Sequence, residues 1–204
     1  MKRRDILKLA GTGAAVGALT AAGTTAAVAA DSTLNAVWVH GTSAAAEDLN
    51  ALKNVQRVGW GTNFSGKPGA ETWFHFSIPT PVIIDDVRPT LEKVFVFYRT
   101  DGASVRNIHI YDGPQKIRAF DNLMWKGDFG NIGPATSWVL NPAPTIAFGL
   151  GISIGVVFSI GFDSAVTTDI LFTTAGADFR LKKPASQFLQ PTDKIDRQRL
   201  TIPH

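Results

Sequence analysis

The segment that most constrains the fold is residues 146–162, IAFGLGISIGVVFSIGF, in which large apolar residues alternate with small ones. Every even position carries a bulky apolar side chain, and nearly every odd position is glycine, serine or alanine. A period of two places the large side chains on one face of an extended chain, whereas a helix would scatter them around its surface. Each interior glycine would also cost a helix about 1 kcal/mol. The segment therefore predicts a β-strand with one face in a hydrophobic core.

The same segment is longer than an ordinary strand, which has about 5–6 residues. We expect it to bend at Gly151 or Gly155 and pass between two sheets, or to form a hairpin with a three-residue loop. The alternation also fits a membrane-spanning hairpin of a pore-forming protein, or a strand used in self-assembly at the cell surface. A buried core strand is the interpretation that we favour.

The rest of the chain consists of short apolar segments separated by turns rich in Gly, Pro and Asp. Residues 43–54 alone have a helical composition, with Ser43 as the candidate cap. About ten strands with little helix predict an all-β fold, an antiparallel β-sandwich of jelly-roll type. The expected strands, besides the central segment, are residues 34–40, 55–60, 72–78, 82–84, 93–99, 105–111, 116–120, 123–126, 136–140 and 165–174.

The two ends of the chain differ from the middle. Residues 1–30 predict a cleaved export signal, because Lys2-Arg3-Arg4-Asp5-Ile6-Leu7-Lys8 resembles a twin-arginine motif and a weakly apolar Ala/Gly/Thr region follows it. This resemblance implies export in the folded state to the periplasm or the cell exterior, with membrane contact only during export. We expect residues 31–179 to form the sandwich domain and residues 180–204 to be a basic, disordered tail.

Composition excludes several classes of function. The chain has no cysteine, so it has no disulfide, thiolate metal site or cysteine nucleophile. The formal net charge of +3 comes from the first thirty residues, which hold four basic side chains and one acidic one. The domain between the two ends is mildly acidic, and we therefore expect no nucleic-acid partner.

Aromatic residues supply the first hypothesis about function, a non-enzymatic module that binds a carbohydrate or another cell-surface polymer. Aromatic rings stack on the apolar faces of sugars, while amide and carboxylate groups hydrogen-bond the hydroxyls. The candidate ligand-binding residues are Trp38, Trp60, Trp73, Asn107, Tyr111 and Asp112.

Histidines supply the alternative, a metal-dependent hydrolase. His40, His75 and His109 lie in expected strands, each two positions from an aromatic residue. If those strands are neighbours, the three imidazoles form a zinc site with an open position for water; otherwise each makes its own hydrogen bonds. Calcium is the other candidate metal, because carboxylates recur in the expected turns. The sequence leaves the cofactor and the oligomeric state open.

Several short motifs resemble an uncharacterised family of bacterial β-rich domains over roughly residues 35–175. The resemblance rests on Val58-Gly59-Trp60-Gly61-Thr62, Gly66-Lys67-Pro68-Gly69, Trp73-Phe74-His75-Phe76, Ile78-Pro79-Thr80-Pro81 and Tyr111-Asp112-Gly113-Pro114. It implies a β-rich fold. It implies no activity and adds no catalytic residue.

Overall fold

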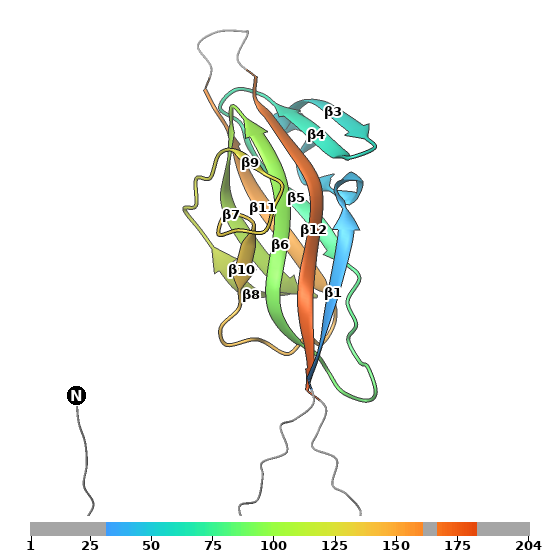
Figure 1. The fold of residues 1–204 in the computed structure, drawn as a ribbon. Helices are drawn as coiled ribbons and strands as arrows, with labels where there is room; N and C mark the ends of the chain where they lie inside the picture. The colour runs from blue at the N-terminus through green and yellow to red at the C-terminus, as the bar shows by residue number, and fades with distance from the viewer. Residues whose placement is uncertain (1–31, 161–166, 183–204) are drawn as a thin grey trace, which may run out of the picture.

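The computed structural model describes residues 32–160 and 167–182, which form a sandwich of two antiparallel β-sheets (Figure 1). The predicted all-β fold is confirmed. The seven-stranded sheet has the order β10 (Ser137–Val139), β6 (Thr90–Asp101), β12 (Asp169–Lys182), β4 (Gly61–Gly66), β3 (Leu52–Val58), with β1 (Ser32–His40) paired to β12 and β9 (Asp128–Phe129) paired to β6. The five-stranded sheet has the order β2 (Ala45–Ala46), β5 (Glu71–Ile78), β11 (Leu150–Phe158), β7 (Ala103–Asp112), β8 (Gln115–Phe120).

The central segment of the sequence contains β11, the middle strand of the five-stranded sheet. Its even residues, from Leu150 to Phe158, are at most 3% exposed, which confirms the predicted core face. The expected crossing between sheets, or hairpin, was wrong, because β11 pairs with β5 on one side and β7 on the other along its length. The alternation also predicted too long a buried face, because Phe148 and Ile160, just beyond the ends of β11, are 74% and 73% exposed.

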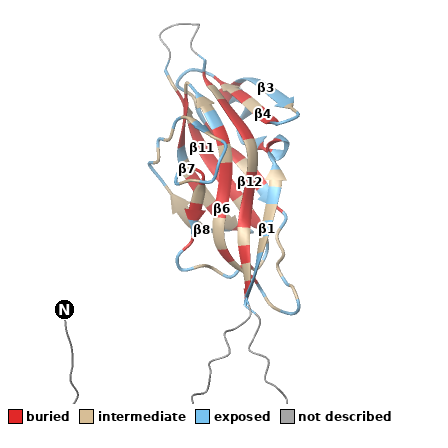
Figure 2. Ribbon diagram, in the orientation of Figure 1, coloured by how far each residue is buried: buried red, intermediate tan, exposed pale blue. Residues whose placement is uncertain are grey.

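The core fills the space between the two sheets. Figure 2 shows the buried residues gathered along β6, β7, β11 and β12, whereas β3 is largely exposed. Phe64, Phe74 and Phe172 form an aromatic cluster across the two sheets, with ring centroids 4.5 Å apart for Phe64 and Phe74 and 5.2 Å for Phe74 and Phe172. Burying one such side chain contributes about 1.5–3 kcal/mol, so the packed rings fix how the sheets face each other.

The helix expected in residues 43–54 was wrong. The structure has two 3₁₀ turns there, η1 (Gly41–Ser43) and η2 (Leu49–Ala51), with the short strand β2 between them. β2 pairs with the edge of β5, and the backbone N–H of Glu47 donates to the carbonyl of Trp73 at 2.8 Å. Hydrogen bonds to this otherwise open edge outweigh the helical propensity of the alanines. The pairing also brings the Glu47 side chain onto the outer face of the five-stranded sheet.

Smaller differences concern the strand list and the ends. The segments 82–84 and 123–126 make only isolated bridges, Ile84 with Val87 and Trp125 with Val105. β12 begins at Asp169 and runs to Lys182, so residues 180–182 belong to the sheet rather than to the tail.

The predicted export signal and residues 183–204 lie outside the described residues. Within the described residues, no helix is long and apolar enough to cross a membrane.

Candidate functional site

The candidate site lies on the outer face of the five-stranded sheet, over its three middle strands. On β11 the outward residues are Gly151, Ser153 and Gly155, the small positions of the alternating pattern. The register places each of them between one residue of β5 and one of β7. The three cross-strand rows are Ser77–Gly151–Tyr111, His75–Ser153–His109 and Trp73–Gly155–Asn107. The residues on β11 are small and their partners on β5 and β7 are larger. A trough therefore runs along β11.

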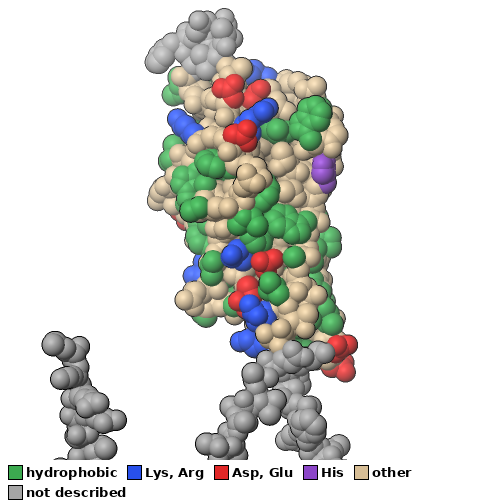
Figure 3. Space-filling model, viewed as in Figure 1, with side chains coloured by type: hydrophobic (Ala, Val, Ile, Leu, Met, Phe, Trp, Pro, Cys, Tyr) green, Lys and Arg blue, Asp and Glu red, His purple; other side chains and the backbone are tan. Residues whose placement is uncertain are grey.

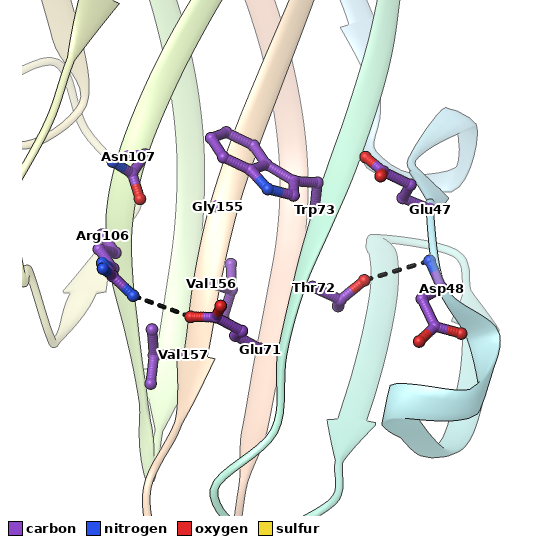
Figure 4. Close-up of a pocket in the computed structure, with 10 residues that line it drawn as sticks. All are labelled: Glu47, Asp48, Glu71, Thr72, Trp73, Arg106, Asn107, Gly155, Val156 and Val157. Carbon is purple, nitrogen blue, oxygen red and sulfur yellow. Dashed lines mark hydrogen bonds and ion pairs between the residues drawn. The ribbon is translucent and has the colours of Figure 1, made fainter.

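Trp73 and Asn107 lean toward each other over Gly155. A Cβ atom placed on Gly155 would lie 3.0 Å from Asn107 Oδ1 and 3.3 Å from Trp73 Cη2. Figure 4 shows the indole extending from β5 across β11. An added side chain would press on both Asn107 and Trp73, and with glycine at this position the backbone of β11 forms part of the floor of the site.

Two hollows lie along this face, and Trp73 and Glu47 line both of them. The first has a volume of about 370 Å³ and is lined also by Asp48, Glu71, Thr72, Arg106, Asn107 and residues 155–157. The second has a volume of about 300 Å³ and is lined also by His75, His109, Tyr111, Lys116 and Ser153. These volumes are at the lower end of the range for small-molecule sites. Their linings are mainly polar, with one large aromatic ring between them.

The first hollow owes its shape to a β-bulge. The pairing of β11 with β7 shifts between Gly155 and Val156 and skips Arg106, so that Arg106 and Asn107 both line the hollow. Arg106 Nη1 donates to Glu71 Oε2 at 2.8 Å, as Figure 4 shows. The ion pair joins β7 to β5 across β11, and the carboxylates of Glu47 and Asp48, which also line the hollow, are exposed.

The second hollow holds two histidine–carboxylate pairs. His75 Nδ1 lies 2.9 Å from Ser153 Oγ, and His75 Nε2 lies 3.0 Å from Glu47 Oε2. On the opposite side, His109 Nε2 lies 2.8 Å from Asp121 Oδ1, and the His109 ring lies 4.7 Å from the Trp73 ring. The hydrogen bonds from His109, and then from Asn107, lower the pKa of Asp121.

Half of the predicted ligand-binding residues meet on this face, namely Trp73, Asn107 and Tyr111. Trp38 lies on the seven-stranded sheet, stacked on Phe95 with ring centroids 4.8 Å apart. Trp60 is 65% exposed between β3 and β4. Figure 3 views the seven-stranded sheet, on which hydrophobic side chains gather over the middle of the face.

Asp112, another predicted ligand residue, is buried at the end of β7. Its carboxylate accepts backbone hydrogen bonds from Ala147 at 2.8 Å, Phe148 at 2.8 Å and Gly149 at 3.0 Å. Burial by itself would raise the pKa of Asp112, but these hydrogen bonds outweigh it and lower the pKa. The side chain thus fixes the loop that leads into β11.

The three histidines do not converge. His75 and His109 stand on either side of Ser153, whereas His40 ends β1 on the other sheet, with Nδ1 3.0 Å from Thr42 Oγ1. Within residues 32–160 and 167–182, no group of three or more His, Asp or Glu side chains is arranged to hold a metal ion.

The sequence patterns did not indicate Glu47, Arg106 or Ser153 as site residues, and they included Asp121 only among the turn carboxylates that could bind calcium. Glu47 reaches the site through β2, and Arg106 through the bulge in the pairing of β7 with β11, and neither feature has a sequence signature here. The sequence did contain a sign of Ser153, because it is the polar residue among the small residues on the outer face of β11.

The fold and this face define an antiparallel β-sandwich with a polar, aromatic-lined trough on one sheet. The chain belongs to a family of unknown function, DUF6623, which matches residues 33–180. No curated protein matches the chain. Among solved structures, it is similar to a family 29 carbohydrate-binding module from Piromyces equi, with 9% identity, a TM-score of 0.31 and coverage of 72% of this chain and 90% of that chain. At this TM-score the likeness says nothing about a ligand.

Proposed function

We propose that this protein is a carbohydrate-binding module that holds a segment of a polysaccharide on the outer face of its five-stranded sheet. The observation that carries the proposal is the position of Trp73, a half-buried indole between two polar hollows on an open trough. The apolar faces of sugar rings stack on such an indole, while hydroxyl groups exchange hydrogen bonds with surrounding carboxylates and amides. Asn107, Glu47 and Asp48 supply those groups.

The open form of the trough favours an extended polymer over a small enclosed ligand. The two hollows lie side by side and share Trp73 and Glu47, so neighbouring sugar units of one chain would occupy them together. The export signal that we predict in residues 1–30 would carry the module to the periplasm or the cell exterior, where structural polysaccharides occur.

Affinity electrophoresis of the full-length protein through gels containing soluble polysaccharides tests this proposal. We expect the wild type to be retarded by at least one member of a panel of neutral, acidic and amino-sugar polymers. Trp73→Ala should lose at least about tenfold in affinity, because centrally placed tryptophans dominate binding energies. Trp60→Ala is the matched control, since that indole lies outside the trough, and it should migrate like the wild type.

Two results would overturn the proposal. One is normal migration of the wild type in every gel and normal recovery from insoluble polysaccharides. The other is a reversed pattern among the variants, in which Trp73→Ala is still retarded but Trp60→Ala or Trp38→Ala is not. The ligand would then lie on the seven-stranded sheet.

A further inference from the structure

Ser153, His75 and Glu47 form a continuous chain of hydrogen bonds in the second hollow. Ser153 Oγ lies 2.9 Å from His75 Nδ1, and His75 Nε2 lies 3.0 Å from Glu47 Oε2. A hydroxyl beside an imidazole that a carboxylate orients is the arrangement by which hydrolases activate a serine nucleophile. The three residues come from β11, β5 and the segment after β2, so the fold rather than a local motif brings them together.

The hydrogen bonds assign the protons. A carboxylate only accepts hydrogen bonds, so the proton between Glu47 and His75 is carried by Nε2. In the neutral imidazole Nδ1 then has a free lone pair, and it faces the Ser153 hydroxyl. His75 is therefore set to accept the proton of Ser153, and Glu47 is the positioning residue that holds this tautomer.

Access to Ser153 comes from its glycine neighbours. Residues 151–155 read Gly-Ile-Ser-Ile-Gly, and the two glycines flank Ser153 on the same face of β11. This is the residue pattern of a nucleophile elbow, but here it lies within an extended strand instead of a strand-to-helix turn. Ser153 is 8% exposed on the floor of the 300 Å³ hollow, which leaves a path for a small electrophile.

The hollow also contains groups that can stabilise negative charge. Lys116 and Tyr111 line it together with Ser153, and an ammonium or phenol group donates hydrogen bonds to an oxyanion. The register sets His109, held by Asp121, on the other side of Ser153. Nucleophile, base, positioning carboxylate and donors are thus gathered in one small cavity.

We propose that Ser153 is an acyl-accepting nucleophile and that the second hollow hydrolyses carboxylic esters of small acyl groups, such as those carried by polysaccharide hydroxyls. The choice of a polysaccharide ester rests on the proposed function, whereas the serine chemistry does not. Ser153 Oγ bonds to the ester carbonyl carbon while its proton passes to His75 Nδ1. When the tetrahedral intermediate collapses, the carbon–oxygen bond to the sugar breaks and the sugar oxygen takes that proton.

Water completes the reaction. It attacks the acyl group on Ser153 and gives a proton to His75 Nδ1. The bond to Oγ then breaks, the proton returns to Oγ, and the carboxylic acid leaves. The sum is one ester and one water converted to one alcohol and one acid.

Labelling of the full-length protein with a fluorophosphonate probe tests the proposal independently of any sugar. Ser153 should displace fluoride from phosphorus, and peptide mass spectrometry should find the adduct on Ser153. Ser153→Ala should abolish labelling, and His75→Gln should slow it at least about 100-fold, the usual contribution of a general base. Ser65→Ala, on β4 of the other sheet, is the matched control and should label at the wild-type rate.

The pH profile separates a catalytic role of His75 from a structural one. The wild-type labelling rate should depend on pH, because a general base acts only in its unprotonated form, and His75→Gln should lose this dependence. Glu47→Gln should shift the same profile, because it alters the group that holds His75.

The proposal is overturned if folded wild type shows no adduct on Ser153, or if the adduct forms equally fast in His75→Gln. Loss of polysaccharide retention in Trp73→Ala with Ser153 labelling intact would leave the serine chemistry standing.

Discussion

Asp112, at the end of β7, and Asp121, directly after β8, are two carboxylates whose pKa values are lowered for different reasons. Asp112 is buried and accepts three backbone N–H groups, so it serves the loop before β11. Asp121 is exposed and accepts hydrogen bonds from His109 and Asn107, so it orients residues of the site. The sequence shows both only as acids in turns, and Asp112 was predicted to bind a ligand because its carboxylate could hydrogen-bond sugar hydroxyls.

Asp112→Asn should destabilise the protein by about 1–3 kcal/mol at pH 7, because hydrogen bonds to a buried charged group are lost. The lowered pKa of Asp112 means that its stabilisation is present above the ordinary aspartate pKa of 3.8 and is lost as pH falls through the lower value in the folded state. The variant should therefore lose less stability than the wild type between pH 5 and pH 2.

Urea unfolding at both ends of that pH range measures this difference. Asp86→Asn is the control, because that exposed side chain should change the free energy of unfolding by no more than about 0.5 kcal/mol. Equal stability of Asp112→Asn and the wild type at pH 7 would show that the carboxylate does not hold the loop.

The strand β11 shows what an alternating pattern specifies and what it leaves open. The even positions gave the core face correctly, because burial needs only a large apolar side chain. The odd positions, to which the pattern assigns no role, become the floor of a trough once β5 and β7 lie on either side. That partnership depends on long-range pairing, and a single sequence does not encode it locally. The same limit hid Glu47, which reaches the site through the two residues of β2.

Gly151→Val should fill the trough without disturbing the sheet. A Cβ atom on Gly151 would have Tyr111 Cβ at 3.8 Å as its nearest neighbour, an ordinary contact, and valine favours strands. We expect unchanged or slightly higher thermal stability together with at least about tenfold weaker retention by the polysaccharide. Gly59→Val, where an added Cβ meets nothing within 4 Å, is the control and should leave retention unchanged. Full retention by Gly151→Val would place the ligand elsewhere.

The whole molecule presents two outer faces of different chemistry. On the seven-stranded sheet, Trp38 is 39% exposed, and it packs over Gly176 and against the apolar rings of Phe95 and Phe97. On the five-stranded sheet, Trp73 is surrounded by carboxylate, amide and imidazole groups. Figure 1 shows β1 beginning and β12 ending together at one end of the sandwich, and Ser32 pairs with Lys182 there. Neither chain end of the described domain crosses the trough.

The most direct test of this account is a ¹⁵N–¹H correlation spectrum of the full-length protein, titrated with oligosaccharides that represent the polysaccharide panel. The five tryptophan indole signals are assigned by single Trp→Phe variants. We expect the Trp73 indole signal and the Ser153 and Asn107 amide signals to shift with added ligand, while the Trp38 and Trp60 indole signals stay in place. Shifts confined to Trp38 or Trp60, or no shift with any oligosaccharide, would contradict it.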